Sequence, residues 1–155
     1  MITENKYGVE VVRVVDGDTV DVDIDLGFGI VLKDERVRIM GIDTPESRTS
    51  DKVEKVFGLA SKQRLKELLN EGAVLITKED KHGEDMKGKF GRILGDFMVG
   101  DRTVTDILIE EGHAVRYHGQ NKDDVAQAHM TNRNKLLSEG VVTEQQVKDA
   151  EDEMK

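Results

Sequence analysis

The clearest pattern in the chain is a strict alternation of apolar and polar residues near the N-terminus. Between residues 20 and 26, Val, Ile or Leu alternates with Asp, which predicts a half-buried strand whose carboxylates meet water. Mostly apolar segments at 9–15 and 35–42 predict strands before and after it. Turn residues separate these segments, at Asp16-Gly17-Asp18-Thr19 and at Gly27-Phe28-Gly29. We therefore expect an antiparallel meander of three strands.

The rest of the chain predicts helices and two further strands. Apolar residues at helical spacing indicate a helix over 52–69. A second helix is expected after the capping residue Thr103, through Glu111, and a third over 123–138. Apolar segments at 73–77 and 90–99 are typical of strands. The pattern thus predicts an α+β fold with a small barrel-like sheet of about five strands and three α-helices.

The length of 155 residues fits one domain. We place that domain at 1–140 and expect residues 141–155 to form a polar, acidic C-terminal tail that frays. The N-terminal sequence lacks the basic and apolar regions of a secretory signal, and no apolar segment reaches membrane-spanning length. We expect a cytoplasmic monomer that does not associate with membranes, although a processed secreted form would look similar.

The composition limits the chemistry. Because the chain has no cysteine, disulfide frameworks, thiolate metal sites and cysteine nucleophiles are excluded. The formal net charge is −9, which argues against broad, nonspecific binding to phosphates. Any phosphate contact must therefore come from a few placed cations or from a bound metal.

Several enzyme classes are excluded by missing motifs. The sequence has no phosphate-binding Gly-Lys-Ser/Thr loop, no Gly-x-Ser-x-Gly elbow and no His-Glu-x-x-His. The four histidines show no spacing typical of metal ligands, and we expect surface or packing roles for His82, His113, His118 and His129.

Two acidic turns are the first candidates for a functional site. Asp16-Gly17-Asp18 and Asp43-Thr44-Pro45-Glu46 are each typical of an ordinary turn when taken alone. However, each closes or precedes a strand of the same meander, so Asp18 and Asp43 can converge at one end of the sheet. Converging carboxylates and a backbone carbonyl form a hard-oxygen site suited to Ca²⁺ or Mg²⁺.

Two arginines could serve the same site. Arg38 lies five residues before Asp43 on one predicted strand, where it needs an anionic partner, either a carboxylate in a structural salt bridge or a phosphate. Arg92 follows Gly91, which allows the close backbone approach that would aim an arginine into a cleft. A simple hairpin role for Arg92 is equally compatible with that pattern.

Taken together, three ordered motifs are more specific than any one of them. Asp16-Gly17-Asp18-Thr19, the segment 37–46 (VRIMGIDTPE) and Lys89-Phe90-Gly91-Arg92 resemble, in order and spacing, the staphylococcal nuclease (thermonuclease) family. The likeness extends over roughly residues 9–138. It implies an OB-like five-stranded β-barrel with three α-helices, and a Ca²⁺-dependent nuclease that cleaves DNA and RNA to products with 3′-phosphates.

The resemblance also implies a metal site and a general base. Asp18 and Asp43 would be metal ligands, with the backbone carbonyl of Thr44 as a third. Glu46 would act as the base that positions a water. Because a divalent ion offsets these carboxylates locally, the acidic net charge is compatible with such a site.

Phosphate and substrate contacts follow from the same resemblance. Arg38 and Arg92 would bind the phosphate and stabilise charge in the transition state. Substrate contacts are expected at Lys89 and Tyr117, the latter as a platform for base stacking. Phe90 departs from the family pattern, because it replaces a tyrosine whose hydroxyl can contact a terminal phosphate.

Two alternatives stay open from sequence alone. The chain could be a noncatalytic module that keeps the barrel to bind nucleic acid or protein, since a fold does not by itself imply an activity. It could also be a nuclease that prefers a divalent ion other than Ca²⁺.

Overall fold

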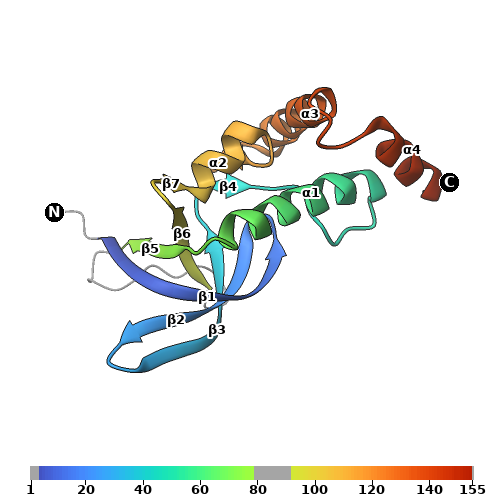
Figure 1. Ribbon diagram of the computed structural model, residues 1–155. Coiled ribbons are helices and arrows are strands. Elements are labelled where there is room, and N and C mark those ends of the chain that lie inside the picture. Colours follow the sequence, from blue (N-terminus) through green and yellow to red (C-terminus); the bar gives the residue numbers. More distant parts are fainter. Residues whose placement is uncertain (1–3, 79–91, 155) are drawn as a thin grey trace.

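The computed structural model describes residues 4–78 and 92–154, and a closed sheet lies at its centre (Figure 1). The strand order is β3-β2-β1-β5-β6-β7, and a parallel pairing of β3 with β6 closes the ring. The five strands of the ring are β1 (Glu4–Asp16), β2 (Thr19–Gly27), β3 (Ile30–Ile39), β5 (Val74–Lys78) and β6 (Ile93–Val99). The OB-like barrel of an α+β fold is therefore confirmed.

The predicted meander is present, with one difference on its polar face. β1 pairs with β2, and β2 with β3, both antiparallel. Asp21 does not meet water as the alternation predicts, because its side chain is only 2% exposed. Arg13 Nε and Arg36 Nε donate to its two carboxylate oxygens over 2.7 and 2.8 Å. The hydrogen bond from Arg36 is the main reason that the pKa of Asp21 is lowered.

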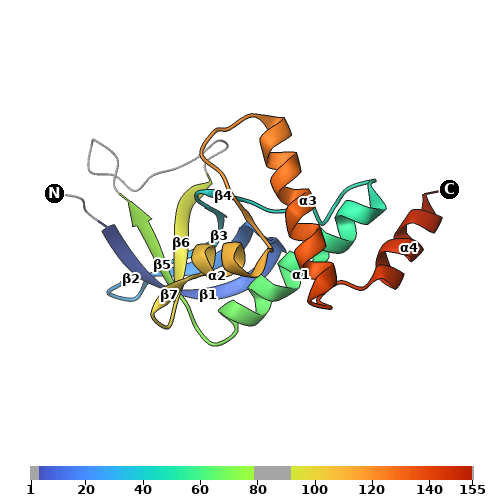
Figure 2. The same cartoon turned by 90° about the horizontal axis from the view of Figure 1, so that it is seen from above.

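The helices cover one side of the barrel, as two views at right angles show (Figures 1 and 2). The structure confirms the three predicted helices, which are α1 (Lys52–Leu69), α2 (Val104–Glu111) and α3 (Lys122–Ser138). Each begins at a side chain that accepts backbone N–H groups, namely Asp51, Thr103 and Asn121. Over the described residues, no helix has both the length and the apolar character needed to span a bilayer.

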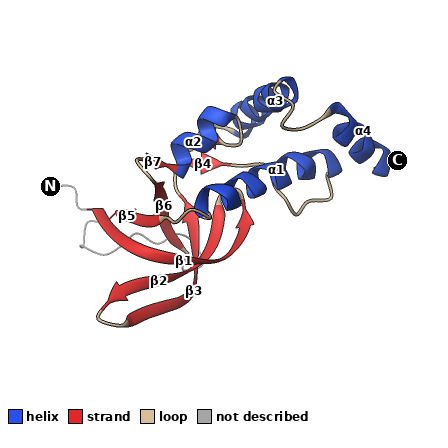
Figure 3. Cartoon of the chain, in the orientation of Figure 1, coloured by secondary structure: helices blue, strands red, loops and turns tan. Residues whose placement is uncertain are grey.

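The C-terminal segment does not fray as predicted. Helix α4 (Glu144–Glu153) begins at Thr143, which forms a reciprocal capping box with Gln146. Just before the helix, Val142 is buried with Phe57 of α1 and Leu136 of α3. Helix α4 then lies beside the N-terminal part of α1 (Figure 3). Apolar contacts therefore hold this acidic segment against the domain.

A short second sheet determines where the C-terminal helices lie. The predicted strand 35–42 is interrupted, because β3 ends at Ile39 and Gly41 takes a positive φ of 78°. The chain then forms β4 (Ile42–Asp43), which pairs with β8 (Val115–Arg116). In the main sheet, the two-residue strand β7 (Arg102–Thr103) pairs antiparallel with the end of β6. The β4–β8 pairing brings the segment that leads into α3 beside the acidic turn at Asp43.

Candidate active site

The sequence-predicted residues meet in a cavity of about 190 Å³ at one end of the barrel. The β1–β2 turn, β3, β4 with the loop after it, and the residue preceding β6 all contribute to its wall. The lining residues are Asp16, Asp18, Thr19, Arg38, Asp43, Thr44, Pro45, Glu46 and Arg92. Six of the eight residues predicted for the site are thus brought together, while Tyr117 lies in an adjoining groove and Lys89 lies outside the described residues.

Asp18 is fixed by hydrogen bonds from both neighbouring turns. Thr19 Oγ1 donates to Asp18 Oδ1 over 2.9 Å, and the backbone N–H of Thr44 donates to Oδ2 over 3.4 Å. Gly17 permits this approach, because a Cβ at that position would lie 2.8 Å from Ser61 Cβ and 3.1 Å from Thr44 Cγ2. The glycine of the Asp-Gly-Asp turn is therefore required by packing.

Arg38 is held by backbone carbonyls and lies against a carboxylate. Its Nη1 donates to the carbonyl of Ile39 over 2.7 Å, and its Nη2 donates to that of Ile42 over 2.9 Å. Nη2 also lies 3.4 Å from Asp18 Oδ2. These contacts hold the guanidinium at the cavity wall, so the structural and the functional interpretation of Arg38 are compatible.

Glu46 lies in a cluster of like charges. Its pKa is raised, first by burial and then by the charges of Asp16, Glu54 and Asp18, with a further contribution from Asp43. The position of Glu46 depends on α1, because Glu54 Oε2 accepts the backbone N–H of Glu46 over 3.1 Å. The protein by itself therefore supplies too little positive charge in the cavity to balance these carboxylates.

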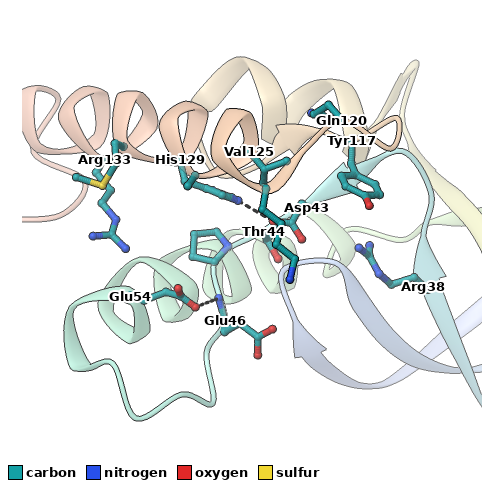
Figure 4. Close-up of a pocket in the computed structure, with 14 residues that line it drawn as sticks. Arg38, Asp43, Thr44, Glu46, Glu54, Tyr117, Gln120, Val125, His129 and Arg133 are labelled. Carbon is teal, nitrogen blue, oxygen red and sulfur yellow. Dashed lines mark hydrogen bonds and ion pairs between the residues drawn. The ribbon is translucent and has the colours of Figure 1, made fainter.

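Sequence reasoning missed a histidine at this site. His129 of α3 donates through Nε2 to Asp43 Oδ2 over 2.7 Å (Figure 4). The two residues are 86 positions apart, so no local motif joins them. The phase of α3 is the only available signal, since it places His129 on the same face as Val125.

The donors in the cavity suit a hard divalent cation. They are carboxylate, carbonyl and hydroxyl oxygens, and Thr44 Oγ1 is buried without a hydrogen-bond partner among the described residues. Among residues 4–78 and 92–154, no group of three or more His, Asp or Glu side chains has the geometry to hold a metal by itself. An ion at Asp18, Asp43 and the Thr44 carbonyl would therefore keep several waters, as such cations commonly do.

The fold and site together define an OB-like barrel with a carboxylate–arginine cavity at one end. The family model described as "Staphylococcal nuclease homologue" matches residues 36–139, which is more than half of the chain. This protein belongs to the staphylococcal nuclease family. The match includes β4, α1 and α3 as well as most of the cavity.

Several named proteins are similar in sequence to this chain. The thermonuclease of Staphylococcus intermedius is 34% identical over 102 residues, which cover 66% of this chain and 55% of that protein. Endonuclease YncB of Bacillus subtilis (strain 168) is 34% identical over 102 residues, covering 66% and 44%. The micrococcal nuclease of Shigella flexneri is 32% identical over 125 residues, covering 74% and 62%. In each case less than two thirds of the relative's length is matched.

Proposed function

We propose that this protein is a Ca²⁺-dependent nuclease that hydrolyses phosphodiester bonds of DNA and RNA to products with 3′-phosphates. The observation that carries the proposal is the convergence of Asp18, Arg38, Asp43, Glu46 and Arg92 on one cavity. Similarity to proteins named thermonuclease, endonuclease and micrococcal nuclease supports it. Ca²⁺ dependence and the 3′-phosphate ends rest on the family resemblance and the oxygen-rich donor set.

The carboxylates at the barrel end would hold the ion. Asp18 and Asp43 would contribute carboxylate oxygens, and the carbonyl of Thr44 would be the third protein ligand. The bound cation supplies positive charge that offsets the phosphate and the surrounding carboxylates. Since Asp18 already lies near Arg38 and the Thr44 amide, the protein holds this ligand in place before the ion binds.

Glu46 is suited to accept a proton from the attacking water. A carboxylate with a raised pKa is a better base near neutral pH than an ordinary glutamate. As the water oxygen bonds to phosphorus, its proton passes to Glu46, the bond from phosphorus to the 5′-oxygen breaks, and solvent protonates that oxygen. The phosphate stays on the 3′ side, in agreement with the proposed products.

Arg38 and Arg92 would neutralise charge on the phosphate. In-line attack builds negative charge on the equatorial oxygens, which arginine forks bind well. Arg38 keeps its two carbonyl partners while its 3.4 Å contact with Asp18 is exchanged for a phosphate oxygen.

Cleavage of a labelled single-stranded oligonucleotide by Glu46→Gln tests the mechanism. We expect kcat to fall by about 10²- to 10⁴-fold, as for loss of a general base, with Ca²⁺ binding by calorimetry retained. Glu71→Gln is the matched control, because Glu71 is exposed in the turn after α1. Mass spectrometry should find 3′-phosphate ends. Wild-type turnover by Glu46→Gln, or 5′-phosphate ends, would contradict the mechanism.

The two alternatives give different results in the same assay. A noncatalytic module would bind the oligonucleotide without turnover at any metal concentration. A nuclease that prefers another ion would be faster with Mg²⁺ or Mn²⁺ than with Ca²⁺ in a matched series.

A further inference from the structure

A larger groove adjoins the catalytic cavity and leads away from it. It encloses about 590 Å³ and shares Arg38, Asp43 and Glu46 with the cavity. Figure 4 shows α3 along one side of the groove, with the loop at Thr44 and the start of α1 opposite. The groove therefore adjoins the cavity along a shared wall, next to the position proposed for the scissile phosphate.

One face of α3 forms a wall of this groove. The residues that line it recur at helical positions i, i+3, i+4, i+7, i+8 and i+11, and they are Lys122, Val125, Ala126, His129, Met130 and Arg133. The centre of the face is mainly apolar and both ends are cationic. At 1.5 Å per residue, the two cations are separated by about 16 Å along the helix, which is long enough to follow several nucleotides.

Both end cations lack an acidic partner within the described part of the chain. Among the described residues, neither Lys122 nor Arg133 forms an ion pair with a carboxylate. The Nε of Arg133 is buried and has no hydrogen-bond partner among the described residues. The guanidinium of Arg133 lies 5.0 Å from the centroid of the Phe57 ring. In a chain of net charge −9, two such cations on one groove indicate an anionic ligand.

The acids on the groove do not neutralise these cations. Asp43 and Glu46 belong to the proposed metal and base positions, and Glu54 is engaged by the backbone N–H of Glu46. Asp43 and Glu46 also line the cavity, whereas Glu54 and Arg133 lie on the side of the groove away from Arg38, and among the described residues no ion pair joins these two (Figure 4). The groove thus offers cations to an anion that enters from the cavity.

We propose that the groove binds the nucleotides next to the scissile phosphate, as a single strand whose phosphates contact Lys122 and Arg133. This inference rests on the proposed function and specifies its substrate as a polynucleotide several nucleotides long. Unpaired bases and sugars would pack on the apolar centre of the face, at Val125 and Met130. Continuity with a phosphodiester-binding cavity is the reason to choose a polynucleotide over an acidic peptide.

Kinetics on substrates of two lengths test the groove. For a 12-nucleotide single strand, Lys122→Gln and Arg133→Gln should each raise KM about tenfold with little change in kcat. For a dinucleotide, whose only phosphodiester would occupy the cavity and leave no phosphate for Lys122 or Arg133, KM and kcat should stay at wild-type values. Lys148→Gln, at an exposed cation of α4, is the matched control and should behave as wild type with both substrates.

A binding measurement separates this inference from the activity. Fluorescence anisotropy of the same labelled strand in EGTA gives Kd as a function of salt, and each lost phosphate contact should reduce the log–log slope by about 0.7. If Kd, its salt dependence and KM are unchanged in both variants, the proposed strand-binding role of the groove is wrong, while the nuclease proposal is unaffected. Loss of binding in the variants of a protein that never cleaves would instead reject the nuclease and retain the strand-binding groove. Because Arg133 also packs over Phe57, Lys122→Gln carries the test if Arg133→Gln unfolds.

Discussion

At the scale of single residues, the Asp43 side chain has two roles. One carboxylate oxygen accepts the hydrogen bond of His129, and the side chain also lines the cavity in which the metal is proposed to bind. Hydrogen bonds from outer residues commonly fix the orientation of metal-binding side chains. We therefore expect His129 to position Asp43, and it connects the helix that lines the proposed substrate groove with the proposed metal site.

Substitution of His129 should weaken metal binding. His129→Ala removes the donor to Asp43, so we expect the calorimetric Kd for Ca²⁺ to rise about 10- to 100-fold, while His129→Gln retains an N–H donor and loses less. His118→Ala is the matched control, because His118 is exposed. If His129→Ala binds Ca²⁺ more tightly than wild type, the imidazole competes with the ion and does not support it.

The acidic and cationic residues of the cavity were predictable because they lie in short motifs. Asp18, Asp43 and Arg38 occur on turns and strands of one meander, whose periodicity places them at one barrel end. Arg92 depended mainly on the resemblance and on Gly91, and it does line the cavity. His129 was not predictable, since its contact depends on how α3 docks.

At the scale of elements, the position of Glu46 depends on a glycine inside a helix. Gly58 is an unfavourable choice for the middle of α1 by helix propensity alone. In the structure, a Cβ at this position would overlap the carbonyl oxygen of Glu46 and lie 2.7 Å from the Ser47 nitrogen. The glycine thus lets the loop that carries Glu46 pack directly on the helix.

Gly58→Ala should therefore be harmful, although alanine normally stabilises a helix. We expect it to lower the free energy of unfolding in urea by about 1–3 kcal/mol, as overpacking does, and to reduce cleavage because Glu46 moves. Gly8→Ala is the control, since a Cβ there meets nothing within 4 Å. A Gly58→Ala protein that is as stable and active as wild type would show that the loop packs differently.

Two adjacent valines test whether the segment before α4 is packed. Val142 is 1% exposed and Val141 is 49% exposed. At about 0.8 kcal/mol per buried CH₂, Val142→Ala should lower the free energy of unfolding by about 1–2 kcal/mol. Val141→Ala should change it by less than about 0.5 kcal/mol. Equal, near-zero effects in both variants would show that this segment is frayed, as its composition predicts.

Elements with a strong hydrophobic period were predictable, whereas those formed by tertiary contacts were not. The alternation at 20–26 and the helical spacing at 52–69 identify β2 and α1 almost to their ends. Helix α4 is too polar for its apolar positions to stand out. The β4–β8 pairing joins two-residue strands, which no period can indicate.

At the scale of the whole molecule, a buried histidine makes stability depend on pH. His113 lies beneath α1, where Ser61 Oγ donates to its carbonyl oxygen over 2.8 Å. Burial is the main reason that its pKa is lowered from 6.5. The unfolded chain therefore binds a proton near pH 6.5 that the folded protein does not, and the folded state loses stability as the pH falls below 6.5.

This dependence should be visible between pH 7 and pH 5. We expect the free energy of unfolding of the wild type to fall over that interval more steeply than that of His113→Gln, which cannot titrate there. Denaturant unfolding at several pH values measures the difference between the two slopes. Parallel curves for the two proteins would mean that His113 is protonated equally in the folded and unfolded states.

The net charge of −9 and the cavity of carboxylates and arginines are the reasons for proposing that catalysis requires a cation. Cleavage of a fluorescent single-stranded oligonucleotide by the wild-type protein, with Ca²⁺ and with excess EGTA, tests that requirement most directly. We predict turnover with Ca²⁺, its loss in EGTA and its return when Ca²⁺ is restored. Equal cleavage in both conditions, or none with any divalent ion, would contradict a metal-dependent nuclease.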